Sequence, residues 1–404
     1  MTFPNMTGAL SGIKVLDLSR VLAGPWSTQI LGDLGADVIK VESINGDDTR
    51  QWGPPFMENE AGDSAYYLSA NRNKRSIVID LSTPQGQALL KQLALKADVL
   101  IENFKFGGLE KYGLDAKTLL AAHPKLVYCS ITGFGQSGPY RQRPGYDFVI
   151  QGMAGLMSIT GTESSGPLRV GVAVTDLATG LYATVAILAA LRHAEQTGQG
   201  QHLDVSLMDT QVAMLANQSL NYLVGGRPPG LIGNTHPTIV PYQVFKTNDR
   251  PLIVAVGNDG QFKAFCSILK CPEWASDERF STNRQRVINR DQLVELIQQK
   301  LLTEGVEHWL EQLLAHNIPA GPVNRLDDVF NDPHVQQRRM AQSIQRGDDV
   351  LPTVRFPVEM SQTPAAVHRP PPRLAEHTKE VLMEWLGMSA EEITALSQQR
   401  VVVE

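Results

Sequence analysis

Short apolar runs alternate with helix-length amphipathic segments through the first third of the chain. The runs are rich in β-branched residues and predict strands, at Ile13–Leu18, Asp37–Glu42, Ser76–Leu81, Val99–Glu102 and Leu126–Ile131. Helices are predicted between them, over Trp26–Leu34 and from Thr83 to about Ala97, where Pro84 suits the first turn. Strands separated by helix-length segments are typical of a parallel sheet with helices on both faces. We therefore predict an α/β fold built on a large Rossmann-like sheet.

The pattern changes further along the chain, and these changes mark predicted domain boundaries. Long helices are predicted over Asp176–Glu195 and Met208–Val224, after which the Gly/Pro-rich segment Gly225–Pro229 breaks the pattern. Strands such as Tyr242–Lys246 then precede several amphipathic helices, which indicates a smaller α+β domain. The C-terminal part includes the segment Val354–Val358 and two predicted helices from Glu376 onward. The predicted division is a large domain made of residues 1–224 and the returning segment 321–404, with a small domain at 225–320.

Composition narrows the class of protein. The 404 residues are 42% hydrophobic, which is ample for packed cores, and the net charge of −6 argues against a nucleic-acid partner. No apolar run reaches the roughly 20 residues that a membrane-spanning helix needs, so no membrane partner is expected. Cys129, Cys266 and Cys271 lack disulfide or metal-site spacing and favour a reducing compartment. We expect a protein of the bacterial cytoplasm, or of the mitochondrial matrix if it is eukaryotic.

Two segments next to predicted strands have the residue types of a nucleotide site. The loop Ser19–Pro25 lacks the G-x-G-x-x-G dinucleotide pattern, but it leads into a helix whose first N–H groups favour a phosphate. The run Asn71–Arg75 is basic, as a phosphate site requires. From the residues alone, the first segment is also consistent with an ordinary strand-to-helix loop, and the second with a solvated charged face.

Asp176 lies at the predicted start of the long apolar helix. Asp is a preferred N-cap, and the positive end of the helix dipole is expected to keep its carboxylate ionised. The same position suits a nucleophile, because a carboxylate can attack an activated acyl group and hold it as a mixed anhydride. Free N–H groups nearby would stabilise the oxyanion. The residue pattern by itself is compatible with a helix cap and with a covalent catalyst.

Two longer stretches resemble the class III coenzyme A transferases, the family of formyl-CoA and carnitine CoA-transferases. Val21–Glu42 is similar to the family's opening βαβ unit, and Val170–Gly180 is similar to the turn that carries its acyl-accepting aspartate. The resemblance extends over nearly the whole chain. It implies an enzyme that moves CoA between carboxylic acids through a covalent intermediate on Asp176, with acyl-CoA as substrate and no tightly bound cofactor. It also implies a homodimer of two interlocked chains.

The resemblance further implies a set of CoA-binding residues. The turn after the first strand, the N-x-N-K-R-S segment at 71–76 and the E-N-F turn at 102–104 match the family's CoA-binding motifs. The implied CoA contacts are Val21, Ala23, Lys74, Arg75, Asn103, Phe104, Lys111, Arg143, Tyr146 and Asp147. Ser43 stands where formyl-CoA transferases have a basic residue, which changes the expected phosphate contacts.

Three further residues are candidates for contacts with the acyl group. The family's small domain closes over this end of the substrate, which implies roles for Asn234 and His236 in the loop that opens the predicted small domain. An ordinary loop histidine is the alternative for His236. Arg169 precedes Asp176 and would suit a bidentate pair with a distal carboxylate, or else a salt bridge at the surface or at a dimer contact.

The stretches Arg50–Pro55, Gly155–Gly161 and Val240–Thr247 are similar to the succinyl-CoA:glutarate CoA-transferase branch. We therefore predict transfer of CoA from succinyl-CoA to a dicarboxylic acid such as glutarate. Oxalate, formate or a carnitine-type acid is the alternative acceptor. A CoA-ester racemase is disfavoured because Tyr146, a weak base, replaces the racemase histidine of a Gly-His-Asp motif. A non-catalytic CoA-binding protein on the same fold is the remaining alternative.

Overall fold

The computed structural model describes residues 8–58 and 62–404, which form two compact units. Unit 1 extends to Leu156 and resumes at Arg169–Gly225 and His334–Glu404, while unit 2 consists of Met157–Leu168 and Gly226–Pro333. Unit 2 thus ends later than the predicted residue 320. It also includes a hairpin of β6 (Gly161–Thr162) and β7 (Gly166–Pro167), because the N–H of Gly233 donates to the carbonyl oxygen of Gly161 at 2.8 Å.

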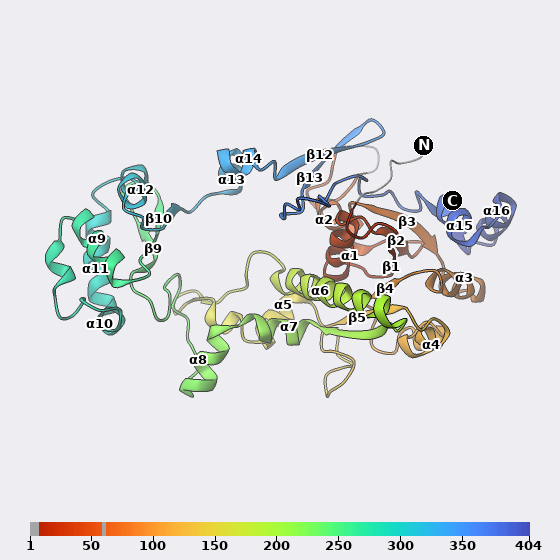
Figure 1. Cartoon of the computed structure of the whole chain (residues 1–404), viewed down its shortest axis with the longest axis horizontal. Coiled ribbons are helices and arrows are strands. Elements are labelled where there is room, and N and C mark those ends of the chain that lie inside the picture. The colour runs from red at the N-terminus through yellow and green to blue at the C-terminus, as the bar shows by residue number, and fades with distance from the viewer. Residues whose placement is uncertain (1–7, 59–61) are drawn as a thin grey trace. The chain divides into compact units, whose positions relative to one another are not determined.

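Within the described residues, unit 1 is built on a seven-stranded sheet of order β14-β3-β2-β1-β4-β5-β8 (Figure 1). Its strands are β1 Lys14–Asp17, β2 Asp37–Glu42, β3 Lys74–Ile79, β4 Val99–Glu102, β5 Val127–Thr132, β8 Gln201–Ser206 and β14 Val402–Val403. Neighbouring strands are parallel except at the edge, where β14 pairs antiparallel with β3. The strand order reverses at β1, which has β2 on one side and β4 on the other. The predicted α/β fold with a large parallel sheet is confirmed.

Helices cover both faces of this sheet. The helices of unit 1 include α1 Ala23–Asp33, α2 Ala65–Ala70, α3 Pro84–Ala94, α4 Ala116–Ala122, α5 Asp147–Met153, α6 Val174–Thr197, α7 Leu207–Met214, α8 Asn217–Gly225, α15 Thr378–Leu386 and α16 Ala390–Gln398, of which α8 buries no residue. One buried cluster joins Leu16 of β1 to Leu90 of α3 and Leu382 of α15. The other joins Val15 to Ile187 of α6. Val15 and Leu16 enter different clusters because successive side chains of a strand point to opposite faces.

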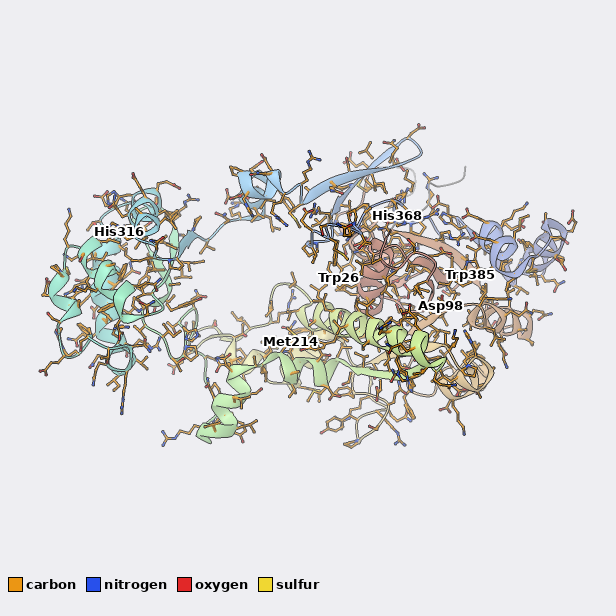
Figure 2. All side chains as sticks on the ribbon, viewed as in Figure 1. Trp26, Asp98, Met214, His316, His368 and Trp385 are labelled. Atoms are coloured by element: carbon orange, nitrogen blue, oxygen red, sulfur yellow. The ribbon has the colours of Figure 1, made fainter. Side chains whose placement is uncertain are left out.

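The C-terminal helices pack against the first part of the chain. The indole N–H of Trp385, labelled in Figure 2, donates to a carboxylate oxygen of Asp37 at 3.1 Å. The ammonium group of Lys14 lies 4.9 Å from the centroid of the same indole. Residues more than 300 positions apart therefore share one layer of unit 1.

Unit 2 has a core and a sheet of its own. Its described strands β9 Tyr242–Lys246, β10 Pro251–Ala255 and β11 Ala320–Pro322 form an antiparallel sheet. Its helices include α9 Asp259–Ile268, α10 Asn283–Ile288, α11 Arg290–Leu301, α12 Val306–Ala315 and α13 Leu326–Asn331. Phe262, Phe265 and Leu293 are among the fully buried side chains that hold the helices on the sheet.

One local prediction is wrong. The helix predicted over Met208–Val224 is interrupted between α7 and α8, because Ala216 adopts a positive φ of 45° that does not continue a helix. In the C-terminal part, Val354 is the last residue of a hairpin of β12 (Ala341–Arg346) and β13 (Asp349–Val354). A short helix, α14 Pro333–Gln337, precedes this hairpin. The hairpin escaped prediction because its alternation of apolar and polar residues is weak.

The helix α6 is the one helix in the described part of the chain that is long and apolar enough, by length and composition, to cross a membrane. However, 56% of its most apolar stretch is buried within unit 1. It packs against α1, α5 and α7 and against the sheet. A core helix has the same composition, and we describe α6 as the central helix of this face.

Candidate active site

The parallel strands bring several loops together at one edge of the sheet. The carboxyl ends of β1, β4 and β5 are neighbours, because β1 pairs with β4 and β4 pairs with β5. Residues that follow these strands line a cavity of about 470 Å³, here called the main cavity. In open α/β sheets, ligands bind outside the carboxyl ends of the strands where the strand order reverses, which here is at β1 and β4.

Most of the residues predicted from sequence motifs meet in the main cavity. They come from the turn after β1, the loop after β4, the segment before α5 and the first turn of α6. Among the described residues these are Val21, Ala23, Asn103, Phe104, Lys111, Arg143, Tyr146 and Asp176. The predicted nucleophile and most of the predicted CoA contacts therefore share one cavity, although they are far apart in the sequence.

Asp176 is the third residue of α6, not its N-cap, which is Ala173. Its half-buried side chain lines the main cavity. Burial, and in addition the negative charge of Asp147, raise the pKa of Asp176 to about 7. The expectation that the helix dipole keeps this carboxylate fully ionised is therefore wrong near neutral pH, because desolvation and a like charge outweigh the dipole.

Asp147 holds the first turn of α6 in place. Its Oδ1 accepts hydrogen bonds from the N–H groups of Thr175 at 2.8 Å and of Asp176 at 3.3 Å. Its Oδ2 accepts from Nε2 of Gln151 at 2.6 Å. Because alanine at the N-cap has no polar side chain, this carboxylate from α5 satisfies the helix N–H groups instead. Asp147 is buried and does not line the main cavity, so the structure places it behind Asp176.

Asn103 connects the loops on the two sides of the strand-order reversal. Its side-chain carbonyl accepts from the N–H of Arg20 at 3.0 Å, and its amide donates to the carbonyl oxygen of Arg20 at 2.8 Å. The E-N-F motif therefore has a structural use here in addition to its position in the cavity lining. It attaches the loop after β4 to the turn after β1.

Lys74 lies outside the main cavity and is fully buried beneath the turn after β1. Its Nζ donates at 3.0–3.1 Å to Asp17, to the carbonyl oxygen of Pro25 and to Asn71. Burial is the main cause that lowers the pKa of Lys74 to about 8, against the attraction of Asp17. All three ammonium hydrogens thus have partners inside the protein, which leaves Lys74 without a donor for a phosphate.

Arg75 also lies outside the main cavity, on the opposite face of β3. Its guanidinium group pairs with Asp37 at 2.6 Å and with Glu380 and Glu384 of α15 at 2.8 and 2.6 Å. The side chain fastens α15 to the sheet. The two basic residues of the N-x-N-K-R-S segment therefore stabilise the two layers of unit 1, because alternate residues of a strand enter opposite layers.

Three basic residues of the main cavity escaped prediction. Including them, the cationic side chains that line it are Arg20, Lys105, Lys111, Arg141 and Arg143. The guanidinium carbon of Arg143 lies 3.9 Å from the centroid of the Tyr140 ring, which orients it. Cations at this density suit a ligand with several phosphate charges. Arg20 and Lys105 directly adjoin the predicted Val21 and Phe104, and Arg141 lies two residues before the predicted Arg143. This proximity is the signal that sequence reasoning overlooked.

A second cavity, of about 350 Å³, is lined by residues at the carboxyl ends of β2 and β3 and in the loops that follow β1, β2 and β3, and both Lys40 and Asp47 border it. Arg20 and Phe104 line this second cavity as well as the main cavity. Ser43, which replaces a basic residue of formyl-CoA transferases, is part of its lining. The two cavities therefore offer an extended site along one edge of the sheet.

The residues predicted to contact the acyl group do not line these cavities. Arg169 is exposed and donates to two backbone carbonyl oxygens of its own loop at 3.2 and 3.3 Å. Asn234 and His236 belong to unit 2, in the loop before β9, where Nδ1 of His236 accepts from the N–H of Thr238 at 3.2 Å. The substrate roles of these three residues stay predictions.

Tyr66 of α2 is near the candidate nucleophile and was not predicted. Burial raises the pKa of Tyr66 to about 12, and the negative charges of Asp176 and Asp147 contribute to the increase. Its ring packs edge-on against Trp52, with 5.2 Å between the ring centroids. No motif pointed to Tyr66, because only the packing of α2 in unit 1 brings it near residues that follow it by more than 80 positions.

Comparison with known proteins adds four findings. The model of CoA-transferase family III matches residues 10–378. A succinate–glutarate CoA-transferase of Agrobacterium fabrum is 52% identical over 386 residues, which cover 94% of this chain and 96% of that protein. The human succinyl-CoA:glutarate CoA-transferase is 44% identical over 379 residues, 93% of this chain and 86% of that protein. The crystal structure of a CaiB/BaiF family protein from Brucella suis has a TM-score of 0.84 and 47% identity, covering 94% of this chain and 99% of that one.

Proposed function

The chain belongs to CoA-transferase family III, and on this premise we propose that it transfers CoA from succinyl-CoA to glutarate or a similar dicarboxylic acid, with Asp176 as the covalent acceptor. As a family III transferase it is an enzyme that uses CoA thioesters as substrates. The observation that carries the proposed role of Asp176 is its position in the main cavity, together with the turn after β1 and several cations. The names of the two transferases support the choice of donor and acceptor.

CoA would lie along the two cavities, with its thioester end in the main cavity. Its phosphates carry several negative charges, and Arg20, Lys111 and Arg143 are placed to neutralise them. Phe104 lines both cavities and offers an aromatic face where they meet. Lys74 and Arg75 have no part in this proposal, because their donors are already bound to other groups of the protein.

The chemistry divides one difficult transfer into displacements at acyl carbons. A carboxylate oxygen of Asp176 attacks the thioester carbon of succinyl-CoA, the C–S bond breaks, and a mixed anhydride forms as CoA thiolate leaves. The thiolate then attacks the aspartyl carbon of the anhydride, releasing succinate and forming an enzyme–CoA thioester. Glutarate attacks this thioester to give a second anhydride and free thiolate. Attack of the thiolate on the glutaryl carbon yields glutaryl-CoA and regenerates the Asp176 carboxylate.

The surroundings of Asp176 suit these steps. Only the ionised carboxylate can attack, so the rate should rise with pH as Asp176 loses its proton near pH 7. Its partial burial leaves the ionised carboxylate poorly solvated, and a poorly solvated carboxylate is a stronger nucleophile. We further propose that Asn234 and His236 face the acyl group and that Arg169 binds a distal carboxylate, as the family resemblance implies.

We also propose that two chains form a homodimer, interlocked as in the family. Supporting this, helices α5 to α8 of unit 1 carry large apolar side chains that are exposed in the single chain. They include Phe148, Met153, Leu181, Tyr182, Val185, Tyr222, Leu223 and Val224. Val185 is 65% and Leu223 is 72% exposed, which is unfavourable for a helix surface that faces water. The proposal predicts that the wild type sediments as a dimer. The double variant Val185→Glu with Leu223→Glu should form a dimer that dissociates at higher protein concentration. A monomeric wild type would contradict the proposal.

The proposed reaction can be tested with purified protein, succinyl-CoA and a mixture of mono- and dicarboxylic acids. Mass spectrometry would identify every new thioester, and the variant Asp176→Ala would be assayed in parallel. Glutaryl-CoA that forms with the wild type and is lost in the variant is the expected result. A thioester of oxalate or another acid in place of glutaryl-CoA would reassign the acceptor. Product that persists in Asp176→Ala would rule out the covalent aspartate.

A further inference from the structure

The turn after β1 has an unusual backbone conformation. Val21 has a φ of 72°, in the left-handed region that residues other than glycine seldom occupy and that β-branched residues strongly avoid. Its side chain lines the main cavity. A strained conformation at a functional site persists only when the surrounding structure holds it. The contacts of this turn should therefore show what holds Val21.

Side chains bind the backbone polar groups of the two residues before Val21. The N–H of Ser19 donates to Asp17 at 2.9 Å, and the carbonyl oxygen of Ser19 accepts from Nζ of Lys40 at 2.9 Å. Both backbone groups of Arg20 bind the amide of Asn103 at 3.0 and 2.8 Å. Within the described residues, no backbone hydrogen bond of a helix or strand uses these four groups. Side chains determine the path of the turn instead: Asp17 from β1 itself, Lys40 from β2 and Asn103 from the loop after β4.

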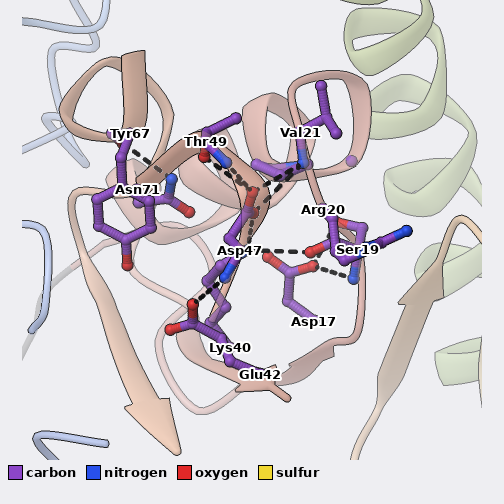
Figure 3. A network of polar contacts seen from close by, with 12 residues as sticks. Asp17, Ser19, Arg20, Val21, Lys40, Glu42, Asp47, Thr49, Tyr67 and Asn71 are labelled. Atoms are coloured by element: carbon purple, nitrogen blue, oxygen red, sulfur yellow. Dashed lines mark hydrogen bonds and ion pairs between the residues drawn. The ribbon is translucent and has the colours of Figure 1, made fainter. Parts of the chain in front are cut away.

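Asp47 binds Val21 itself. The N–H of Val21 donates to both carboxylate oxygens of Asp47, each at 3.3 Å (Figure 3). Lys40 in turn donates to Asp47 at 2.8 Å, and Thr49 fixes the other oxygen through its N–H at 3.0 Å and its hydroxyl at 2.8 Å. The backbone N–H of Asp47 donates to Glu42 at 2.8 Å. The carboxylate is thus held on every side while it points at Val21.

The Lys40–Asp47 pair is completely buried, with neither side chain exposed. Burial alone would raise the pKa of Asp47, but the Lys40 ammonium group lowers it to about 2, so the carboxylate stays charged. A buried ion pair usually stabilises a fold no better than apolar residues of the same size. Its directional, charge-assisted hydrogen bonds can instead hold a particular geometry. Here that geometry is the left-handed conformation of Val21.

We propose that Asp47 and Lys40 are positioning residues for CoA binding, because they hold the turn around Val21 in its binding conformation before CoA arrives. The inference rests on the proposed function, since it takes the turn to be a CoA contact. Both residues also border the second cavity, but their side chains are completely buried. We therefore expect them to act through the backbone groups that they bind, the carbonyl oxygen of Ser19 and the N–H of Val21. Without them the turn would relax, and CoA binding would have to order it again, which weakens affinity.

The decisive variant replaces the ion pair by apolar residues of similar size, Lys40→Met together with Asp47→Leu. This variant should fold, because such replacements are often neutral or stabilising. CoA affinity is measured by calorimetry with CoA alone, and folding by thermal denaturation. We expect the Kd of CoA and the KM of succinyl-CoA to rise about tenfold, with the KM of glutarate unchanged. A stably folded variant that binds CoA as tightly as the wild type would overturn the proposal.

Asp33→Asn is the matched control. Asp33 lies at the other end of α1 and pairs with Arg72 in a buried ion pair at 2.5 Å, without contacting the turn. Together with Asp47→Asn it separates a general loss of stability from a loss of positioning. Both single variants should lower the melting temperature, but only Asp47→Asn should weaken CoA binding by more than about twofold. Equal weakening by both would overturn the proposal.

Val21→Gly tests the route by which Asp47 acts. Glycine adopts a positive φ without strain, so the turn should depend less on Asp47 in this background. We expect the effect of Asp47→Asn on CoA affinity to fall from about tenfold to less than threefold. An undiminished effect would show that Asp47 does not act through Val21. If the wild type itself binds no CoA, the proposed function fails, whereas wild-type binding with unaffected variants overturns only this inference.

Discussion

Asp47 and Asp176 are two carboxylates beside the same turn, and their surroundings give them opposite properties. Asp47 is paired with Lys40 at 2.8 Å, and its pKa is lowered to about 2 despite burial. Asp176 faces a like charge, Asp147, and burial with this repulsion raises its pKa to about 7. The first remains ionised and holds a backbone in place. The second is a poorly stabilised carboxylate that lines the main cavity, as a nucleophile requires.

Burial does not explain the difference between these two carboxylates, because burial by itself acts to raise the pKa of both. The charge that each carboxylate meets is what separates them. Glu102 provides a third case, because burial raises its pKa to about 7, yet its side chain does not line the main cavity. A raised pKa therefore indicates reactivity only where the group also opens into the substrate site.

The largest expected effect is that of Asp176→Asn, which removes the reactive carboxylate at nearly constant shape. Loss of a covalent nucleophile should lower kcat by about 10³-fold or more. Stability at pH 8 should be equal or higher by about 1–2 kcal/mol, because an acid whose pKa is raised on folding destabilises the fold once it is ionised. Transfer assays and urea denaturation would measure both. Activity within tenfold of the wild type would contradict the role of Asp176.

Lys40→Met should lower the stability of the fold, the opposite of the effect expected for Asp176→Asn, because it acts on Asp47. It leaves the buried Asp47 without its cation and should lower the free energy of unfolding by about 3–5 kcal/mol at pH 7. An acid with a lowered pKa stabilises the fold above its ordinary pKa and loses that contribution as pH falls through its folded pKa, so the deficit should shrink as pH falls from 3.8 to about 2. Denaturation at several pH values would measure it. The control is Lys263→Met at an exposed lysine, which should change the free energy of unfolding by no more than about 0.5 kcal/mol. An equal loss in both variants would show that Lys40 stabilises the fold no more than an exposed lysine does.

Asp147→Asn should move the pH dependence of the reaction. The amide oxygen can still accept from the first N–H groups of α6, but the like charge beside Asp176 is gone. The pKa of Asp176 should fall, although burial, the larger cause, remains. We expect the acidic limb of kcat/KM, near pH 7 in the wild type, to shift downward by about one pH unit. A limb that stays in place or moves upward would show that Asp147 does not raise the pKa of Asp176.

The smallest effect is expected for Glu102→Gln. Because burial raises the pKa of Glu102 to about 7, its ionisation destabilises the fold progressively between pH 4.5 and 7 and fully above it. The amide avoids this penalty, so the variant should gain about 1 kcal/mol at pH 8 and nothing at pH 4. The kcat should stay within about twofold of the wild type. A large loss of kcat would show that Glu102 takes part in the reaction although it does not line the main cavity.

Several elements and motifs were predictable because they are local. The bounds of β2, β4 and β9 agree with the apolar runs that predicted them. The alternation of strands and helices correctly indicated the parallel sheet. A strand of such a sheet is buried on both faces, so its sequence is a nearly continuous apolar run that can be recognised locally. The motif residues Val21, Phe104 and Asp176 do meet in one cavity, because the carboxyl ends of neighbouring parallel strands share an edge.

The sequence by itself thus determined the fold class, the family and the segments that form the site. The tertiary structure alone decided what each charged side chain does. Lys74 was expected at a phosphate, but Asp17, 57 residues away in the sequence, binds it in the interior. Asp176 was expected to be ionised, but burial and the negative charge of Asp147 raise its pKa to about 7. The reason is physical: periodicity encodes which face of an element is buried, whereas desolvation and Coulomb energies depend on partners that only packing brings near.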